Sequence, residues 1–473
     1  MADIVSFLDK KAPDLFAIAD EVWKAAEVGF QEVKSSKVQA DYLEANGFDV
    51  RRGVADVPTA FIAEWGSGRP IIGFLGEFDA LAGISQEVWP ERKPVVPGAP
   101  GHGCGHNLLG TAALGAALAL KEALAGSGKA GTVRYYGCPA EELLAGKVYM
   151  ARAGVFDDLD VAITWHPGAL TTVSMGSGTA MNSAKFRFHG KTAHAAGDPH
   201  NGRSALDAVE LMNVGANYLR EHVIPDARIH YVITEGGGQP NVVPAEAEVW
   251  YFVRAPRRSQ VEEIYARLLD VAKGAALMTG TTHEVNFLTG CYEVLLNETL
   301  ADVMWRNLQK VGVPQFDEAD MEFARKLALT FDPNSVQNML RNPDFAEFKE
   351  LKEKPLATVL IPPRGKGRAG GGSTDVGDVS WIVPTVQMSA STVPLGCPGH
   401  SWQHVASSGS SIGKKGMMVA AKTMALCGWD LVEHPEEIAQ AKAEFQEKTK
   451  DSPYKCPFPK DRKLPLDEFF KKA

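Results

Sequence analysis

The sequence predicts an α/β protein: a main domain with a mostly parallel sheet and helices on both faces, plus an inserted smaller domain. Three observations support this prediction. The length of 473 residues exceeds what one hydrophobic core usually supports. Short apolar runs alternate with helical patterns between residues 59 and 165, which is typical of parallel strands joined by helices. Residues 182–296 have a different rhythm, in the order β-α-β-β-α-β of a ferredoxin-like unit.

The main domain begins with helices. Residues 4–46 carry apolar side chains such as Phe7, Leu15 and Val22 at helical spacing. After Gly47 the pattern changes to short apolar runs, which indicate strands buried on both faces. We expect strands at 59–65, 70–76, 132–138 and 161–165, and helices at 107–124 and 146–153.

The sequence pattern of the inserted domain predicts two helices and four strands. The strands are expected at 183–189, 228–234, 245–253 and 282–288, and the helices at 204–222 and 259–278. Because inserted domains of this kind cover a site or pair with another copy, we expect residues 182–296 to form a lid and dimerisation domain. Residues 1–181 and 297–473 are then the catalytic domain. Its second part holds helices from about residue 300, a glycine-rich loop at 365–373, a strand at 383–389 and a helix at 411–425.

Composition excludes several classes of protein. The formal charge is −9 and no basic block is present, which argues against nucleic acid as a partner. No signal peptide opens the chain, and no segment reaches the roughly 20 uninterrupted apolar residues of a membrane span. The six cysteines are too widely spaced for a disulfide framework. We therefore expect a cytoplasmic protein without membrane contact.

The most informative motif is the glycine-rich loop at residues 101–107, which contains Cys104 and His106. Cysteine and histidine are preferred ligands of Zn²⁺ and similar ions, while glycine lets the backbone fold closely around an ion. By itself such a loop could also be a structural metal knuckle or an ordinary turn. Other candidate ligands lie after predicted strands: Glu77, Asp79, Glu141, Glu142, His166 and His400. In open α/β sheets, sites form beyond the carboxyl ends of strands, so these residues are expected to converge.

The residue types fit a two-metal hydrolase. Two divalent ions about 3.5–4 Å apart need a bridging ligand, terminal ligands and a general base. The candidate metal ligands are Cys104, His106, Glu142, His166 and His400. Glu141 would be the general base, taking a proton from water and delivering it to the leaving amine. A Glu-Glu pair alone is a weak signal, but this one follows a predicted strand end.

The chain resembles the M20 metallopeptidases, in particular the M20D amidohydrolase branch. The matching segments span nearly the whole chain in order: Gly76–Leu81, Gly101–His106, Gly137–Glu142, Thr164–Pro167, Lys191–Ala196, Pro240–Pro244, Ser373–Trp381 and Gly399–Gln403. The resemblance implies two divalent ions, Zn²⁺ or Mn²⁺, with Cys104 in the bridging position. It also implies a homodimer in which His194 of the lid reaches the neighbouring protomer's site and stabilises the oxyanion. Asn241 aligns with a lid asparagine that assists substrate binding.

The reaction implied by the resemblance is hydrolysis of a small-molecule amide, an N-acyl or N-aroyl amino acid of the p-aminobenzoyl-glutamate type. Indole-acetyl amino acids, other acyl amino acids and dipeptides are alternative substrates on the same scaffold. A non-catalytic regulatory subunit is another alternative, and a related second subunit is a further expected partner. Arg254, at the end of a lid strand, is a candidate for binding a substrate carboxylate, because guanidinium groups bind carboxylates in a planar geometry.

Several alternatives remain open at this point. Many M20 enzymes have His-x-Asp where this chain has Glu77-Phe78-Asp79, so Glu77 is placed beside the metal ligands rather than among them. His102 is interpreted as part of the loop scaffold. His404 competes with His400 for the last ligand position, and the motif match favours His400.

Overall fold

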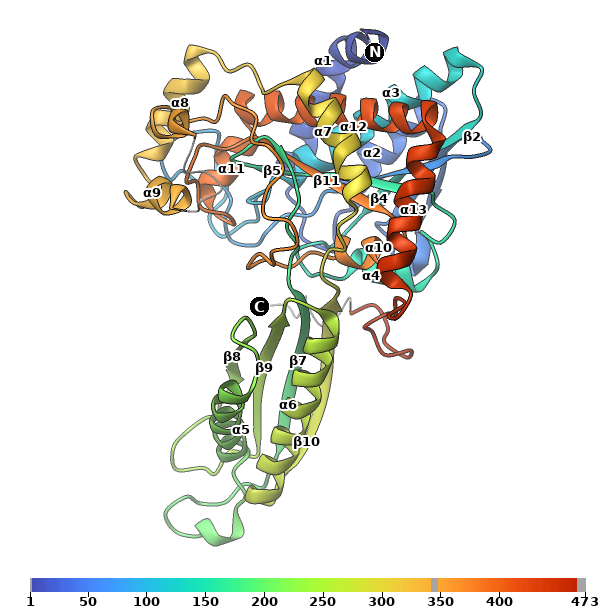
Figure 1. Ribbon diagram of the computed structural model, residues 1–473. Coiled ribbons are helices and arrows are strands. Elements are labelled where there is room, and N and C mark those ends of the chain that lie inside the picture. The colour runs from blue at the N-terminus through green and yellow to red at the C-terminus, as the bar shows by residue number, and fades with distance from the viewer. Residues whose placement is uncertain (1, 342–347, 466–473) are drawn as a thin grey trace. The chain divides into compact units, whose positions relative to one another are not determined.

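The computed structural model describes residues 2–341 and 348–465, which form two compact units (Figure 1). The large unit comprises Met1–Gly176, Leu295–Arg368 and Val379–Tyr454. The small unit comprises Ser177–Val294, Ala369–Asp378 and Lys455–Ala473. Two short segments from later in the chain thus join the small unit, through contacts such as the hydrogen bond between the Thr179 and Ser373 hydroxyls at 3.0 Å.

The large unit contains a seven-stranded mixed sheet in the order β1-β2-β4-β3-β5-β11-β6. Its strands are β1 (Asp49–Arg52), β2 (Phe61–Ser67), β3 (Ile71–Glu77), β4 (Gly131–Cys138), β5 (Val161–Gly168), β6 (Thr172–Val173) and β11 (Thr385–Ser391). The four central strands β4, β3, β5 and β11 are parallel, while β1, β2 and β6 run antiparallel to their neighbours. The predicted α/β fold with a mostly parallel central sheet is confirmed.

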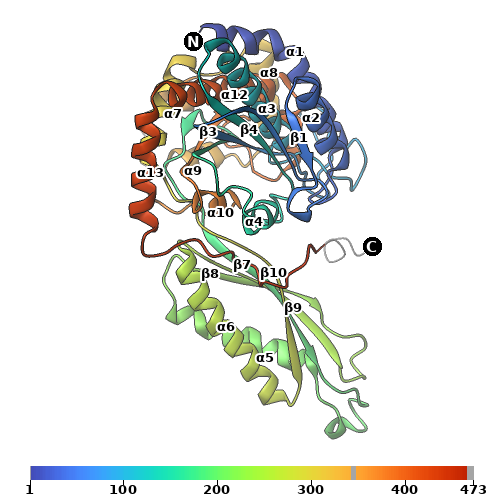
Figure 2. The ribbon, with the colours of Figure 1, turned by 90° about the vertical axis from the view of Figure 1, so that its right-hand side faces the viewer.

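Helices cover this sheet. Helices α3 (His106–Ser127) and α12 (Ser411–Glu433) pack on the central strands, and α1 (Ala2–Ala25) packs on both helices. The short helix α4 (Gly146–Arg152) lies on the other side of the sheet (Figures 1 and 2). The other helices of the large unit are α2 (Val33–Ala45), α7 (Glu298–Val311), α8 (Glu318–Ala328), α9 (Ser335–Leu340), α11 (Trp402–Ser408) and α13 (Pro435–Thr449). Single 3₁₀ turns occur at Val54–Asp56 and Lys349–Lys352.

Helix α3 forms the centre of the core. It is rich in Ala, Leu and Gly, and small residues let neighbouring helices approach: a β-carbon at Gly115 would lie 3.0 Å from Leu15 of α1. By length and composition α3 could cross a membrane, but 78% of its most apolar window is buried inside the protein. Its apolar character therefore follows from its position between the sheet and the helices around it.

The small unit is a four-stranded antiparallel sheet in the order β10-β7-β9-β8, with two helices along one face (Figures 1 and 2). Its elements are β7 (Ala180–His189), α5 (Ala205–Leu219), β8 (Arg228–Glu235), β9 (Glu246–Ala255), α6 (Arg258–Thr279) and β10 (Thr282–Cys291), with 3₁₀ turns at Pro199–Asn201 and Arg220–His222. Helix α10 (Val376–Ser380) lies at a boundary between the units along the chain. Buried and more exposed residues alternate along β9, because one face of the sheet packs on the helices. The predicted β-α-β-β-α-β order is confirmed.

Some elements differ from the sequence-based expectation. Strand β1 was not predicted, because its sequence Asp-Val-Arg-Arg is polar and its extended form depends on pairing with β2. The two-residue strand β6 is too short to produce a periodic pattern. The helix expected at 204–222 ends at Leu219 and continues as a 3₁₀ turn.

Candidate metal centre

The candidate site lies at the carboxyl edge of the central sheet in the large unit. Strands β3 and β4 are parallel and in register so that Glu77 pairs with Cys138, and each strand is followed directly by acidic residues. His166 lies near the end of β5, beside Ser389 of the parallel strand β11. Parallel strands end at the same edge, so residues distant in sequence meet there.

The glycines of the metal loop bring its cysteine and histidine to this edge. Gly105 has φ of 77°, a left-handed conformation that favours glycine, and it is the residue immediately before α3. Gly103 accepts a hydrogen bond from the backbone N–H of His400 at 3.1 Å. A β-carbon at Gly103 would lie 3.3 Å from the Ser401 nitrogen. The bare backbone therefore lets the loop containing His400 approach the metal loop.

Within residues 2–341 and 348–465, three groups of ligand atoms converge, each with all its atoms within 4.8 Å of one another: Cys104, His106 and His166; Cys104, Glu142 and His400; and Glu77, His106 and Glu141. Cys104 belongs to the first two groups. Its Sγ lies 3.3 Å from Nε2 of His166, and His400 Nε2 lies 3.5 Å from a carboxylate oxygen of Glu142. Two atoms that bind one tetrahedral ion at about 2.0–2.3 Å are roughly 3.3–3.7 Å apart, so these spacings fit coordination.

Hydrogen bonds orient the imidazoles of the buried His106 and the half-buried His166. Nδ1 of His106 lies 2.8 Å from Oδ1 of Asp79, and Nδ1 of His166 lies 2.7 Å from the carbonyl oxygen of Pro167. Asp79 also accepts a hydrogen bond from the backbone N–H of Glu142 at 2.9 Å. In metal sites the other ring nitrogen of a ligand histidine donates to such groups, which directs Nε2 toward the ion. Asp79 thus fixes a histidine from one segment and the backbone of another.

Buried polar atoms without a hydrogen bond support a metal at this place. Among the described residues, Nε2 of His106 and Oε1 of Glu142 are buried and form no hydrogen bond. A buried polar atom of this kind costs free energy unless it is paired. A divalent cation would satisfy both atoms, so the residues fit the implied ions.

Burial also perturbs the acidity of the candidate ligands. It raises the pKa of the Cys104 thiol to about 12 and that of the Glu142 carboxyl to about 7, the latter helped by the charges of Asp79 and Glu77. The pKa of His106 lies well above its usual value: burial opposes this, but the charges of Cys104 and Asp79 raise it. Metal binding requires deprotonated ligands, so a bound cation would release protons from this cluster.

Glu141 is buried, and its Oε2 lies 3.8 Å from Nε2 of His106. It follows Ala140, which has a positive φ of 53°. The backbone N–H of Ala140 donates a 2.7 Å hydrogen bond to Glu32, whose other oxygen accepts one from the Thr59 hydroxyl at 2.9 Å. Glu32 therefore holds the turn that carries Glu141.

Glu32 is expected to make the free energy of unfolding dependent on pH. Burial raises its pKa from 4.5 to about 8, assisted by the charge of Asp79. Between these values the unfolded chain has lost the proton and the folded chain keeps it, so the free energy of unfolding should fall as pH rises, by up to about 1.4 kcal/mol per pH unit. In Glu32→Gln this contribution should be absent. Denaturant unfolding of both proteins from pH 5 to 9 measures it; parallel curves would contradict the assignment.

The other candidate residues have different locations. In the small unit, His194 and Asn241 are both exposed and close together, because the backbone N–H of Ala195 donates to the carbonyl of Asn241 at 3.0 Å. Arg254 donates a 2.8 Å hydrogen bond to the Ser373 hydroxyl, and its guanidinium lies over the Phe252 ring. These three residues belong to the small unit, whereas the candidate metal ligands belong to the large unit.

The two alternative histidines are both buried. His102 Nε2 lies 3.0 Å from the carbonyl oxygen of Val22, in keeping with a scaffold role. His404, on α11, is absent from the three converging groups, whereas His400 belongs to one of them. Burial lowers the pKa of His404 to about 3.

Sequence reasoning missed Lys147, whose fully buried ammonium lies 2.7 Å from Glu77. A single lysine in a short helix gives no signal of burial in the sequence.

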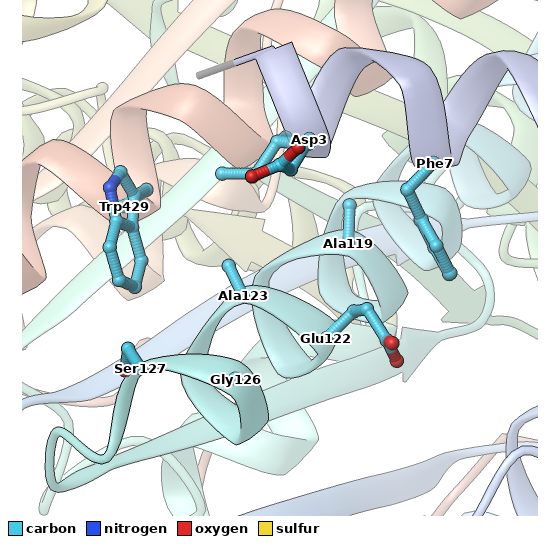
Figure 3. A pocket seen from close by; sticks show the side chains of 9 residues that line it. Asp3, Phe7, Ala119, Glu122, Ala123, Gly126, Ser127 and Trp429 are labelled. Atoms are coloured by element: carbon cyan, nitrogen blue, oxygen red, sulfur yellow. The ribbon is translucent and has the colours of Figure 1, made fainter.

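A cavity of about 380 Å³ lies at the other end of α3 (Figure 3). Figure 3 shows Phe7 and Trp429 with the carboxylates of Asp3 and Glu122 along its wall. It has no thiol or imidazole in its lining. Because α3 is about 30 Å long, this cavity is remote from the His106 end and does not belong to the candidate metal centre.

Comparison with known proteins identifies relatives of the whole chain. Residues 180–277 match the family model "Peptidase dimerisation domain". The chain is 45% identical over 453 residues to one of the subunits of p-aminobenzoyl-glutamate hydrolase from Escherichia coli, covering 94% of each protein. It is 28% identical to human Xaa-Arg dipeptidase, over 94% of this chain and 92% of that protein. A solved structure from Bacillus subtilis, described as a dinuclear metal-binding peptidase of the M20 family, matches with a TM-score of 0.58 at 18% identity, over 90% of this chain and 99% of the other.

Proposed function

This chain belongs to the M20 family of metallopeptidases, and on that premise we propose that it is a two-metal amidohydrolase cleaving N-acyl or N-aroyl amino acids. The observation that carries the proposal is the position of Cys104, whose thiol is common to the two groups that together contain all five proposed ligands. A shared ligand is what two adjacent ions require. The proposed ligands are Cys104, His106, Glu142, His166 and His400, and the proposed ions are Zn²⁺ or Mn²⁺, both of which suit mixed sulfur, nitrogen and oxygen ligands.

The residues of the site then have distinct tasks. Divalent ions bound here would polarise the substrate carbonyl and acidify a water molecule. Glu141, buried and 3.8 Å from His106, accepts the proton of the attacking water and delivers it to the nitrogen of the departing amine. Asp79 keeps His106 and the backbone of Glu142 in place during the reaction.

His194 is proposed to donate to the oxyanion from a second copy of the chain. It lies within the segment that matches the dimerisation domain, and its side chain is exposed. Its Nδ1 accepts hydrogen bonds from the backbone N–H groups of Ala196 and Gly197 at 3.2 and 3.1 Å, which leaves Nε2 as the donor. Such a donor contributes about 3–4 kcal/mol to transition-state stabilisation. Asn241, beside His194, and Arg254 are proposed to bind the substrate.

A hybrid dimer tests this role. His194→Ala should lower kcat by about 10²–10³-fold with both ions retained. Mixing inactive His194→Ala with inactive Glu141→Gln should restore part of the activity, because one of the two sites in a hybrid dimer keeps both groups. Mixing each variant with itself is the control. If hybrids form and no activity returns, His194 does not act across the dimer.

The substrate class is tested by mass spectrometry of products from a panel of N-acyl and N-aroyl amino acids, with protein loaded with Mn²⁺ or Zn²⁺. We expect release of the amino acid from p-aminobenzoyl-glutamate, because the relative that belongs to that hydrolase matches nearly the whole chain, and loss of activity on chelation. Indole-acetyl conjugates and dipeptides ending in arginine belong in the panel, the latter because of the human relative. If the protein binds both ions and hydrolyses none of the compounds, the proposal of an enzyme that acts without another subunit is contradicted. Activity that appears only when a related second subunit is added would then indicate a regulatory role.

We further propose that the protein acts in the cytoplasm as a homodimer. All six cysteines are free, which is compatible with a reducing compartment. The match to the dimerisation domain supports self-association through the small unit.

A further inference from the structure

A buried ion pair lies directly beside the candidate ligands. Glu77, the last residue of β3, is 1% exposed, and the side chain of Lys147 is fully buried. The Lys147 ammonium lies 2.7 Å from Oε1 of Glu77. Burying two charges is costly, and a pair of this kind contributes little to stability compared with apolar residues of similar size. Its position suggests a role other than stabilising the fold.

The second oxygen of Glu77 points toward the metal site. Oε2 lies 3.4 Å from Nε2 of His106, the atom that is buried without a hydrogen bond. The spacing equals that of two atoms bound to one tetrahedral ion, roughly 3.3–3.7 Å. The carboxylate is therefore positioned with one oxygen on the lysine and the other at the coordination position beside His106.

We propose that Glu77 is an additional oxygen ligand of the ion bound by His106, and that Lys147 is the positioning residue that orients this carboxylate. Carboxylates that bind metals usually accept a further hydrogen bond, which fixes the oxygen left for the ion. The lysine also balances charge, because Glu77, Asp79, Glu141 and Glu142 place four carboxylates close to one thiol. One ammonium and two divalent ions offset these five negative charges.

The test is metal affinity measured without substrate, by competition with a chelating dye for Zn²⁺ and by elemental counting of bound ions. Glu77→Gln should weaken one of the two ions by about 10–100-fold and leave the other unchanged. Lys147→Met should weaken the same ion by about tenfold or more. The double variant should be no worse than Glu77→Gln, because Lys147 acts through Glu77.

Lys442→Met is the control for loss of a lysine–carboxylate pair away from the site, at a lysine whose side chain is 37% exposed. Lys442 is paired with Asp160, a buried carboxylate next to the opposite end of β5. This variant should leave both affinities unchanged. Melting of the metal-free proteins separates the proposed role from a purely structural one, which would lower the melting temperature and not the affinity. If Lys147→Met does not fold, the double variant, which leaves no buried charge of this pair unpaired, carries the comparison with Glu77→Gln.

Two results would overturn the inference: wild-type affinity for both ions in folded Glu77→Gln, or a further loss when Lys147→Met is added to Glu77→Gln. The inference rests on the proposed function only in requiring that the site binds metal. A protein that binds two ions and hydrolyses none of the panel would contradict the proposed activity and leave this test intact. A wild-type protein that binds no metal would overturn both.

Discussion

Glu141→Gln is expected to lower kcat by about 10²–10⁴-fold while both ions stay bound, because the amide keeps the size of the side chain but cannot accept the proton. Glu141 is buried at the carboxyl edge of the sheet, 3.8 Å from His106 but outside the two groups that share Cys104. Loss of the carboxylate should therefore remove proton transfer and not the metal. Steady-state kinetics on the substrate identified from the panel, together with elemental analysis, measures both effects.

The control for this substitution is Glu122→Gln, the same chemical change at the remote end of α3 beside the cavity of Figure 3. It should retain wild-type kinetics. A Glu141→Gln enzyme with near-wild-type kcat would show that another group is the general base. A large loss of metal would instead place Glu141 among the ligands, as its proximity to His106 and Glu77 in the third group would allow.

Cys104→Ala is expected to lower the affinity for both ions by more than the roughly 10–100-fold typical of residues that only orient ligands. The reason is that Cys104 is shared between two groups of ligand atoms, whereas His166 and His400 each belong to one. Elemental analysis after dialysis against a chelator should find little metal in Cys104→Ala. Activity should be lost with the metal.

His166→Ala and His400→Ala are the matched comparison. Each should weaken one ion and spare the other. Two tightly bound ions in Cys104→Ala would contradict a bridging role, and equal losses in all three variants would show that the ions bind as one cooperative unit rather than through a shared thiol.

Much of the fold could be predicted from the sequence, since the strongly apolar elements depend on local pattern. Strands β3, β4 and β5 appear as apolar runs, and α3 as a long Ala- and Leu-rich helix after a glycine loop. The weak elements could not be predicted in this way. Strand β1 is polar and is extended because it pairs with β2. Helix α13 (Pro435–Thr449) has few apolar residues and packs on α7 and α12.

The candidate site shows the same division. The residue types of the metal loop and the strand-end positions of Glu141, Glu142 and His166 predicted both a metal site and its edge of the sheet. The interactions that orient these groups could not be predicted from the sequence. Glu32 comes from the segment between α1 and α2, and it reaches Ala140 across 108 residues. Lys147 is one of many lysines, and only packing distinguishes it as buried.

Local sequence patterns were therefore sufficient to predict the α/β class, the β-α-β-β-α-β order of the small unit, and a metal site at one edge of the large sheet. Local periodicity and residue type carry these properties, because both depend on short stretches of chain. The atoms that share a site were found from the tertiary structure alone: Cys104 belongs to two ligand groups, and Lys147 pairs with Glu77. Distances between side chains from separate strands depend on register and packing, which no short stretch of sequence contains.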